Sequence, residues 1–437
     1  MNIILHRGSN EIGGTCIELK KDGSRIILDL GIPLTKPGGG QFDENDLKSP
    51  SFQKEQLPNI KGLYIGDTPS VDAVLLSHAH MDHYGLMDFI HPDIPIYLSI
   101  DAKTIIEVGN VFWTKEMQQK VLLNHCRTFK YWKEFKIGSF SVKPYLVDHS
   151  AYGACAYLIR SEDKKVFYTG DFRAHGNKKI TFDNMLKDKE LKEVDALIIE
   201  GTTLGGGHSK SLDSEEDVLK TMTEVFKKQK DVSFVMCSGS NIDRLVSLFK
   251  ATKAAGKELV LDLYQYYLLV KLKEVYKDSK LPPLKDDHIR IRYIYGHTKK
   301  IADHLGEKFL YKYNHKKIKP DEIIKNRKNL VLRFSVREMA RLAEKMQKEK
   351  SLKDANFIYS MWAGYLNTRK EFYAFSDKYN LNMQEIHSSG HAYKKDLLKF
   401  INTLNPKTVI PVHTLSPEIF RKEVRNIKVT TTKQISF

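Results

Sequence analysis

The sequence has few cysteines and no long apolar run. Its four cysteines, Cys16, Cys126, Cys155 and Cys237, are scattered without metal-like spacing. This distribution argues against a disulfide framework and favours buried free thiols in a reducing cytoplasm. No stretch of the 437 residues approaches 18 consecutive apolar positions, and the first residues show no signal-peptide core. We therefore expect a cytoplasmic protein without a membrane span.

Acidic residues are outnumbered by basic ones. Lys and Arg total 70 against 54 Asp and Glu, which gives a formal net charge of +16. A chain this basic attracts polyanions, and nucleic acid is the obvious one, although a lysine-rich surface can also serve solubility alone. The excess is concentrated in residues 299–328, where Phe309, Tyr311 and Tyr313 are interleaved. That mixture suits a surface that follows the phosphate backbone of a nucleic acid and stacks its bases, unless the aromatic residues belong to the core.

The most chemically specific segment is residues 74–83, an apolar strand that ends in His78, His80, Asp82 and His83. Imidazole nitrogens and carboxylate oxygens suit zinc. The spacing lets His78 and His80 bind one ion while Asp82 and His83 turn toward a second. Two adjacent metals indicate hydrolysis.

Further candidate ligands follow three later apolar strands. Residues 140–147 lead to His149, residues 165–170 lead to Asp171, and residues 407–412 lead to His413. One such residue alone is more often a satisfied polar group than a ligand. Together they complete two sites. The predicted ligands are His78, His80 and His149 for one ion and Asp82, His83 and His413 for the other, with Asp171 bridging both.

Periodicity divides the chain into two kinds of structure. Residues 1 to about 200 read as short strands with turns, such as the hairpin pattern around Lys21-Asp22-Gly23. After that point, a helix capped at 213–214, a buried strand at 232–237 and a helix over 242–256 alternate. This βαβ order predicts a parallel sheet.

A second domain inserted into the first explains how His413 reaches the same metals as Asp171. We expect the first domain to comprise residues 1–202 and 371–437, and the inserted α/β domain to comprise residues 203–370. Insertion requires the chain to leave and return at neighbouring points. The predicted exit is the glycine run at residues 204–207, where the backbone can turn without steric penalty.

The order of these motifs, preceded by residues 27–31, resembles the metallo-β-lactamase superfamily. Residues 197–203, 386–392 and 410–414 resemble the additional motifs of its β-CASP nucleic-acid-processing branch, and the last two are similar to those of bacterial ribonuclease J. The resemblance implies a metallo-β-lactamase αββα sandwich with an inserted parallel-sheet β-CASP domain. It also implies two Zn²⁺ ions, for which Mn²⁺ or Mg²⁺ could substitute. Residues 359–365 depart from the ribonuclease J pattern.

Three residues are candidates for catalysis, namely His391, Glu200 and Asp82. By its motif position, His391 would protonate the departing oxygen, and Glu200 would orient the imidazole and favour its charged form. Asp82 would act as a metal ligand. The alternative for His391 is a structural residue that only supports the ligands.

Two small-residue loops are candidates for phosphate binding. Residues 238–241 lie where a buried strand meets a helix, and residues 388–390 precede His391. Backbone N–H groups and hydroxyls at such places bind anions, and Arg244 could add a charged fork, although a plain N-cap turn uses the same residues. The candidates are Ser238, Ser240, Arg244, Ser388, Ser389 and Gly390.

The expected function is zinc-dependent cleavage of single-stranded RNA by a ribonuclease J-like exo- or endoribonuclease. His413 favours RNA over DNA, because the RNA-processing members of the branch carry a histidine at this last motif. A homodimer is compatible with the resemblance. Two alternatives remain, a non-catalytic RNA-binding scaffold and a thioester or lactam hydrolase on the same fold. Neither alternative explains both the complete ligand set and the basic charge.

Overall fold

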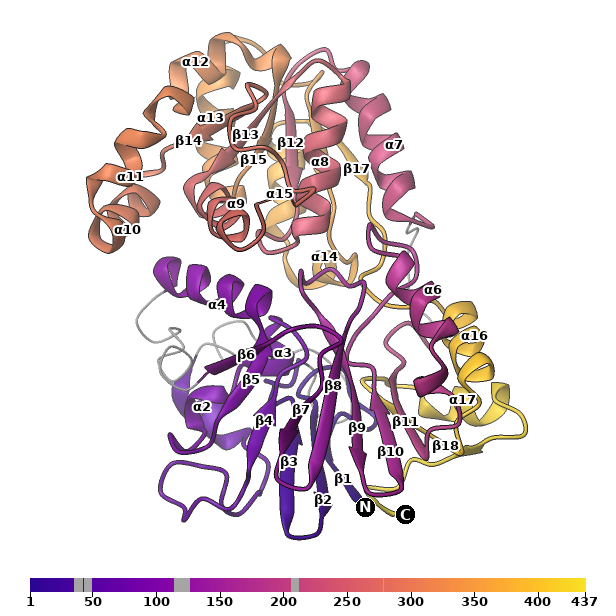
Figure 1. Cartoon of the computed structure of the whole chain (residues 1–437). Coiled ribbons are helices and arrows are strands. Elements are labelled where there is room, and N and C mark those ends of the chain that lie inside the picture. Colours follow the sequence, from indigo (N-terminus) through magenta and orange to yellow (C-terminus); the bar gives the residue numbers. More distant parts are fainter. Residues whose placement is uncertain (35–41, 43–48, 114–125, 206–211, 278) are drawn as a thin grey trace. The chain divides into compact units, whose positions relative to one another are not determined.

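The computed structural model describes residues 1–34, 42, 49–113, 126–205, 212–277 and 279–437. These residues form two compact units (Figure 1). The first unit combines Met1–Gly206 with Gly390–Phe437, and the second is Gly207–Ser389. Two glycines of the predicted exit, Gly206 and Gly207, lie outside the described residues.

In the described part of the chain, the first unit contains two seven-stranded sheets. The first sheet has the order β20-β1-β2-β3-β4-β5-β6 and the second the order β19-β18-β11-β10-β9-β8-β7. The first comprises β1 (Asn2–Arg7), β2 (Cys16–Lys21), β3 (Ser24–Leu28), β4 (Ala73–Leu75), β5 (Ile96–Ser99), β6 (Cys126–Phe129) and β20 (Gln434–Ser436). The second comprises β7 (Phe135–Ile137), β8 (Phe140–Leu146), β9 (Cys155–Ser161), β10 (Lys164–Tyr168), β11 (Ala196–Glu200), β18 (Thr408–Val412) and β19 (Lys428–Val429).

The predicted hairpin joins β2 to β3. Lys21 pairs with Ser24, which leaves Asp22 and Gly23 as a two-residue loop. Both have positive φ, 50° and 77°. A two-residue hairpin turn of this type needs that conformation at both positions, and Asp-Gly adopts it readily.

The two sheets of the first unit pack face to face. Side chains alternate along β10, so Val166 and Tyr168 join the core between the sheets while Phe167 packs on the other face. That other face is covered by α6 (Ile180–Lys187), α16 (Lys394–Leu404) and α17 (Pro417–Glu423). Beside the first sheet lie α2 (Pro50–Glu55), α3 (Met81–Tyr84) and α4 (Ile100–Phe112). The predicted αββα sandwich is confirmed. The remaining short turns are the 3₁₀ helices η1 (Met87–Phe89) and η3 (Lys189–Leu191).

The second unit is built on a six-stranded sheet with the order β14-β13-β15-β12-β16-β17, in which all neighbouring strands run parallel. The predicted parallel sheet is therefore confirmed. Its strands are β12 (Ser233–Met236), β13 (Glu258–Asp262), β14 (Ile289–Arg292), β15 (Leu330–Arg333), β16 (Asn356–Tyr359) and β17 (Asn382–Glu385).

Helices cover both faces of this sheet. On one face pack α7 (Glu215–Lys227), α8 (Ile242–Ala254) and α9 (Leu263–Val275). On the other pack α12 (Pro320–Lys325), α13 (Val336–Glu349) and α15 (Glu371–Lys378). As predicted, α7 begins after a serine cap, with the Ser214 hydroxyl accepting from the backbone N–H of Asp217. The unit also contains α10 (Tyr295–Leu305), α11 (Glu307–Lys312), α14 (Gly364–Thr368) and the 3₁₀ helices η4 (Asn314–Lys316) and η5 (Arg327–Asn329).

The chain returns to the first unit at residue 390, later than the expected residue 371. Residues 371–389 stay in the second unit because α15 packs into its core and β17 adds an edge strand beside β16. The sequence of β17 is Asn-Met-Gln-Glu, with no buried position. An edge strand of this kind carries no apolar signal, so only its backbone pairing reveals it.

Two expectations from composition can be compared with the described residues. All four cysteines are free thiols, buried except for the half-buried Cys126. Among the helices that the structure describes, none is long and apolar enough to cross a membrane.

Candidate metal centre

The predicted ligands meet because several strands of the first unit end at one edge. β10, β11 and β18 are parallel neighbours. β8 runs in the same direction, because it is antiparallel to β9, which is itself antiparallel to β10. In the first sheet, β4 leads to the start of the short helix α3. The residues at these ends are His78, His80, Asp82, His83, His149, Asp171, Glu200 and His413.

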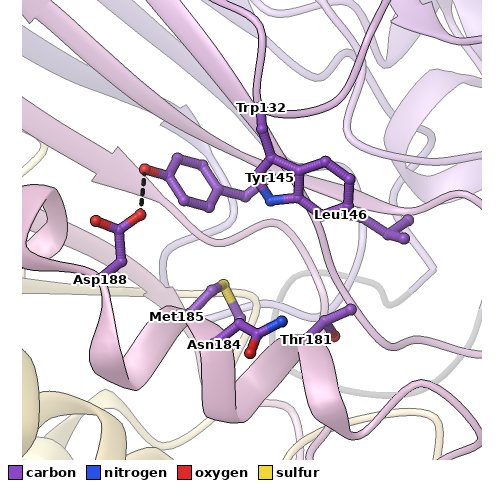
Figure 2. A pocket seen from close by; sticks show the side chains of 7 residues that line it. All are labelled: Trp132, Tyr145, Leu146, Thr181, Asn184, Met185 and Asp188. Atoms are coloured by element: carbon purple, nitrogen blue, oxygen red, sulfur yellow. Dashed lines mark hydrogen bonds between the residues drawn. The ribbon is translucent and has the colours of Figure 1, made fainter.

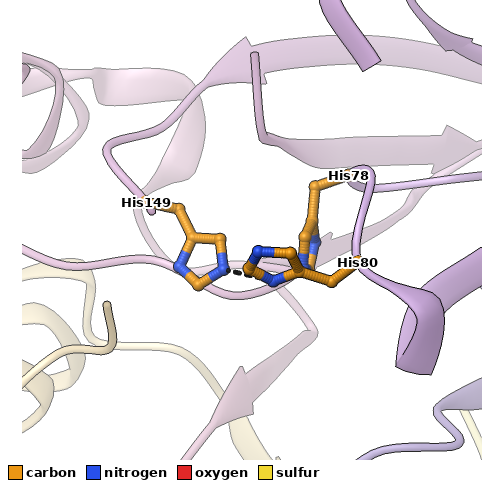
Figure 3. Close-up of side chains that lie close together, drawn as sticks. All are labelled: His78, His80 and His149. Atoms are coloured by element: carbon orange, nitrogen blue, oxygen red, sulfur yellow. Dashed lines mark hydrogen bonds between the residues drawn. The ribbon is translucent and has the colours of Figure 1, made fainter. Parts of the chain in front are cut away.

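His78, His80 and His149 form the first group (Figure 3). The Nε2 atoms of His78 and His149 each lie 3.1 Å from Nδ1 of His80. With zinc–nitrogen distances of about 2 Å, tetrahedral geometry sets two ligand nitrogens about 3.3 Å apart. Burial holds the pKa of His78 and of His149 well below the usual value and lowers the pKa of His80 to about 4. The three imidazoles are therefore neutral, the form that binds metal.

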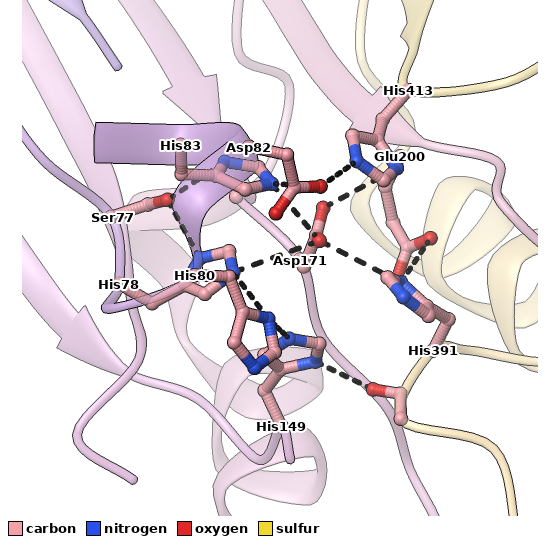
Figure 4. A network of polar contacts seen from close by, with 12 residues as sticks. Ser77, His78, His80, Asp82, His83, His149, Asp171, Glu200, His391 and His413 are labelled. Atoms are coloured by element: carbon pink, nitrogen blue, oxygen red, sulfur yellow. Dashed lines mark hydrogen bonds and ion pairs between the residues drawn. The ribbon is translucent and has the colours of Figure 1, made fainter. Parts of the chain in front are cut away.

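Asp82, His83, Asp171 and His413 form the second group (Figure 4). Oδ2 of Asp171 lies 3.1 Å from Nε2 of His83, and Oδ2 of Asp82 lies 3.1 Å from Nε2 of His413. Oδ2 of Asp171 is also 3.8 Å from Nε2 of His78 in the first group. Asp171 thus stands between the two groups, as the predicted bridging role needs.

Charge differs between the groups. Burial disfavours the charged form of both Asp82 and His83. For Asp82, the imidazoles of His83 and His413 outweigh burial and lower its pKa to about 2. For His83, the carboxylates of Asp171 and Asp82 outweigh burial and hold its pKa well above the usual value. The second group therefore contains charged side chains, whereas the imidazoles of the first group are neutral.

The donors fit a two-metal centre. Three imidazoles in one group, and two imidazoles with two carboxylates in the other, are a typical zinc set. Oδ1 of Asp171 is buried and has no hydrogen-bond partner among the described residues. An unsatisfied buried polar atom costs about 1–3 kcal/mol, and coordination of a cation would remove that cost.

Hydrogen bonds fix which ring nitrogen faces the metal position. Nδ1 of His149 lies 2.6 Å from the carbonyl oxygen of Gly390. Nδ1 of His83 lies 2.8 Å from Oδ2 of Asp29. Because both oxygens can only accept, Nδ1 carries a proton in each ring, and Nε2 is the nitrogen that faces the metal position.

Asp29 organises this support from the end of β3. Its backbone has φ of 58°, and its carboxylate accepts from the Ser77 backbone N–H at 2.6 Å and the Ser77 hydroxyl at 2.7 Å. The Tyr168 hydroxyl donates to the same carboxylate at 2.5 Å. The sequence placed Asp29 only within the family motif and gave Ser77 and Tyr168 no role. The signal available was an acidic residue directly after β3, the parallel neighbour of β4.

Thr202 links His413 to Glu200 and was also missed as a functional residue. Its hydroxyl lies 2.6 Å from Oε2 of Glu200 and 2.8 Å from Nδ1 of His413. A carboxylate only accepts, so the single hydroxyl proton of Thr202 goes to Glu200. The Thr202 oxygen must then accept from the Nδ1–H of His413. With Nδ1 engaged in this way, Nε2 of His413 is the nitrogen that faces Asp82.

His391 lies beside the second group with its side chain 22% exposed. Its Nδ1 is 3.2 Å from Oε2 of Glu200 and 3.7 Å from Oδ2 of Asp171. Burial disfavours the charged imidazole, but these two carboxylates outweigh it and raise the pKa of His391 to about 9. Oε1 of the fully buried Glu200 accepts from the backbone N–H groups of Phe172 at 3.1 Å and Ala392 at 3.4 Å. Glu200 is therefore a fixed anchor for the ring.

The candidate phosphate residues of the second unit differ in exposure. Ser238 is exposed and Ser240 half-buried in the turn before α8, with their hydroxyls 3.1 Å apart. Arg244, expected to offer a charged fork, is fully buried, and its Nε donates to Glu215 at 2.8 Å. Its guanidinium thus pairs with a buried carboxylate and cannot bind an anion from solvent.

The second small-residue loop is tied to the same ion pair. The Ser388 hydroxyl is buried and donates to Oε2 of Glu215 at 3.1 Å. Ser389 ends the second unit, and Gly390 begins the returning part of the first, where its carbonyl orients His149. Arg244 and Glu215 therefore position this segment.

The predicted basic track is only partly at the surface. Lys316 is buried, and its Nζ donates to the carbonyl oxygen of Asp286 at 2.8 Å. Phe309 and Tyr313 pack in the core, whereas Tyr311 is 69% exposed. The exposed lysines of the stretch are Lys299, Lys308, Lys312, Lys317, Lys319, Lys325 and Lys328.

The first unit also has a small pocket (Figure 2). Its volume is about 40 Å³. It shares no residue with the metal groups. Its lining consists of Trp132, Tyr145, Leu146, Thr181, Asn184, Met185 and Asp188.

Comparison with known families agrees with this geometry. A model described as a β-lactamase superfamily domain matches residues 49–224. A model described as a Zn-dependent metallo-hydrolase RNA specificity domain matches residues 378–425. These two matches, together with the fold, show that the chain resembles the metallo-β-lactamase superfamily. Within it, the similarity is to the β-CASP branch that includes ribonuclease J.

Individual relatives are distant. Ribonuclease J of Sinorhizobium meliloti is 26% identical over 54% of this chain and 39% of its own length. Ribonuclease J of Mycoplasma genitalium is 22% identical over 93% of this chain and 66% of its own length. The chain therefore spans less than two thirds of these curated relatives. A solved structure of a protein of unknown function from Enterococcus faecalis V583 shares the fold, with a TM-score of 0.77 at 22% identity over 100% of this chain and 99% of that one.

Proposed function

We propose that this protein is a zinc-dependent phosphodiesterase that cleaves single-stranded RNA in the manner of ribonuclease J. The observation that carries the proposal is the convergence of three and four candidate ligands in adjacent groups, with Asp171 between them. We assign residues 1–206 and 390–437 to a metallo-β-lactamase domain and residues 207–389 to a β-CASP domain. RNA is supported by the RNA specificity match, the ribonuclease relatives and the net charge of +16.

In this proposal, His78, His80 and His149 hold one ion and Asp82, His83 and His413 the other. Two bound ions supply Lewis acidity, activating water and stabilising the charge that develops on the phosphoryl oxygens, and Mn²⁺ or Mg²⁺ could replace zinc. Asp171, which lies between the two groups, would hold both ions, and Asp82 would be a ligand of the second.

His391 acts as the general acid in this proposal. Its Nδ1 is held by Glu200, so Nε2 is the atom that delivers a proton to the leaving oxygen. Such proton transfer typically contributes about 10² to 10⁴ in rate. Because the same leaving oxygen departs at an internal bond and at a terminal one, the chemistry serves exo- and endonucleolytic cleavage alike. His413 favours RNA over DNA.

The test combines elemental analysis with cleavage of labelled single-stranded RNA. We expect the wild-type protein to hold two equivalents of zinc and to cleave the RNA. His391→Ala should keep both ions and lose about 10² to 10⁴ in rate, because it removes only the acid. His413→Ala, the control, should lose the second ion.

One outcome of this test would reassign His391. Its Nδ1, with Asp171 and Glu200, also has the geometry of a metal position. If His391→Ala depletes metal as strongly as His413→Ala does, His391 is a ligand and the general-acid role is wrong. If the zinc-loaded wild type hydrolyses a thioester or lactam but no RNA, the nuclease proposal fails.

A further inference from the structure

The strand order of the second unit has a topological switch point between β12 and β16, where the connections that follow the two strands lead in opposite directions along the sheet. From β12 the chain runs through α8 to β13, with Leu245 of α8 in the core on one face. From β16 it runs through α14 and α15 to β17, with Phe372 of α15 in the core on the other face. In open parallel sheets, ligands bind outside the carboxyl ends of the strands where the following segments diverge.

Two loops flank this switch point. β12 and β16 are paired so that Met236 lies opposite Tyr359, which brings their carboxyl ends level. After β12 come the exposed Ser238 and the half-buried Ser240. After β16 comes Ser360, whose carbonyl oxygen accepts from Nη1 of the buried Arg244 at 3.1 Å. The buried guanidinium of Arg244, on α8, thus connects the loop after β16 to the helix that follows Ser238 and Ser240.

The β16 loop presents an exposed aromatic pair. Trp362 is 43% exposed and Tyr365 37% exposed, with ring centroids 5.3 Å apart and planes at 83°. The Arg369 guanidinium carbon lies 5.8 Å from the centre of the Tyr365 ring. These residues lie in or directly after the segment that departs from the ribonuclease J pattern.

The backbone on either side of Trp362 leaves space for its ring. The Trp362 carbonyl oxygen accepts from the Tyr359 hydroxyl at 3.0 Å. A Cβ atom at Gly364 would lie 2.3 Å from the indole ring, so only glycine allows the indole to lie there. The indole therefore lies against Gly364 and leaves part of its surface exposed for stacking.

We propose that Trp362 and Tyr365 form a nucleobase-stacking subsite in which a base of single-stranded RNA packs on the indole while Ser238 and Ser240 contact the adjoining phosphate. This inference rests on the proposed function and adds the part of the substrate that the second unit binds. A nucleobase suits the pair better than an apolar protein segment, because the Arg369 guanidinium lies beside the Tyr365 ring. Aromatic and cationic groups beside a phosphate cradle are what sequence-tolerant RNA binding uses.

The experiment compares RNA with and without bases. Full-length Trp362→Ala is titrated in chelator, which prevents cleavage, with a fluorescent oligouridylate and with an abasic ribose-phosphate strand of equal length. We expect affinity for the oligouridylate to fall about 10-fold, while affinity for the abasic strand stays unchanged. Trp362→Phe should recover part of the loss. Tyr295→Ala, which removes another exposed aromatic ring of the same unit, should change neither affinity.

Each other outcome has a definite meaning. Equal loss on both strands, or no loss on either, overturns the stacking subsite. Should Trp362→Ala fail to fold, as judged by its thermal melting, Tyr365→Ala takes its place with the same expectation. If wild-type protein binds oligouridylate but never cleaves it with zinc restored, the proposed function fails while the subsite stands. If wild type cleaves RNA and the variants bind it normally, only the subsite is lost.

Discussion

At the residue scale, the candidate centre depends on proton positions as much as on ligand identity. His83, His149 and His413 each direct Nε2 inward because Nδ1 is engaged elsewhere. The three partners differ in kind: a carboxylate, a backbone carbonyl and a hydroxyl. The hydroxyl of Thr202 is the most informative, because it has one proton and that proton is already given to Glu200.

Replacing Thr202 tests this assignment. Thr202→Val keeps the shape of the side chain but removes the acceptor for the Nδ1–H of His413. We expect zinc affinity at the second group to fall about 10- to 100-fold, the usual effect of losing a ligand's supporting partner. Calorimetric titration of metal-free protein measures zinc binding at both groups at once, so the first group serves as an internal reference.

Thr202→Ser keeps the hydroxyl and should bind zinc as the wild type does. Equal weakening in the serine and valine variants would mean that the methyl group matters and the hydroxyl does not, and the proposed proton chain would have to be abandoned.

At the element scale, the ligands of α3 are held by the segment that follows β3. Leu30 donates its backbone N–H to the His83 carbonyl at 2.9 Å, and Ile32 donates to the Met81 carbonyl at 3.0 Å. Between them, a Cβ atom at Gly31 would lie 1.6 Å from the carbonyl oxygen of Asp82. The backbone of the ligand helix therefore passes directly over this glycine.

A methyl group at residue 31 should displace the ligand helix. We expect Gly31→Ala to lower the free energy of unfolding by about 3 kcal/mol, at the upper end for overpacking, because the clash is with backbone. It should also reduce zinc at the second group. Thermal melting and elemental analysis measure the two effects.

Gly296→Ala is the matched control, since a Cβ atom there meets nothing within 4 Å. A Gly31→Ala variant with wild-type melting and full zinc content would show that α3 shifts freely, and the rigid support described here would be refuted.

At the scale of the whole molecule, the net charge of +16 means that RNA affinity should depend on the salt concentration. Lys316 is unsuitable for a test because it is buried, so the exposed Lys317, Lys319 and Lys325 are chosen. Changing all three to Gln should make the salt dependence of RNA affinity shallower, by a log-log slope of about 0.7 for each phosphate that is no longer neutralised. Hydrolysis of a small phosphodiester should not change, because these residues would position polymer only.

The control triple variant replaces Lys227, Lys228 and Lys230, which are exposed at the end of α7 and just after it. It removes the same charge from another part of the same unit. If both triple variants flatten the salt slope equally, net charge alone governs binding and residues 299–328 form no track.

The sequence by itself determined whatever rests on short stretches of chain. The strand into His78, the Asp-Gly hairpin, the Ser214 cap and the βαβ alternation are local patterns, because side-chain period and turn chemistry act over a few residues. The candidate ligands could be found for the same reason, since each follows directly after an apolar strand. The αββα sandwich with a parallel-sheet insert came from the same motifs through their family resemblance.

Only the tertiary structure decided what depends on partners distant in the chain. The polar edge strand β17 is identified by its pairing with β16, so the return point was expected too early. From the sequence, Arg244 and Lys316 were expected to be surface cations. In the structure both are buried, because Glu215 and the carbonyl of Asp286 are their hydrogen-bond partners. Thr202 gained its role from His413, 211 positions away. Hydrogen bonding and burial are set by which strands and helices become neighbours, and no local pattern encodes that choice.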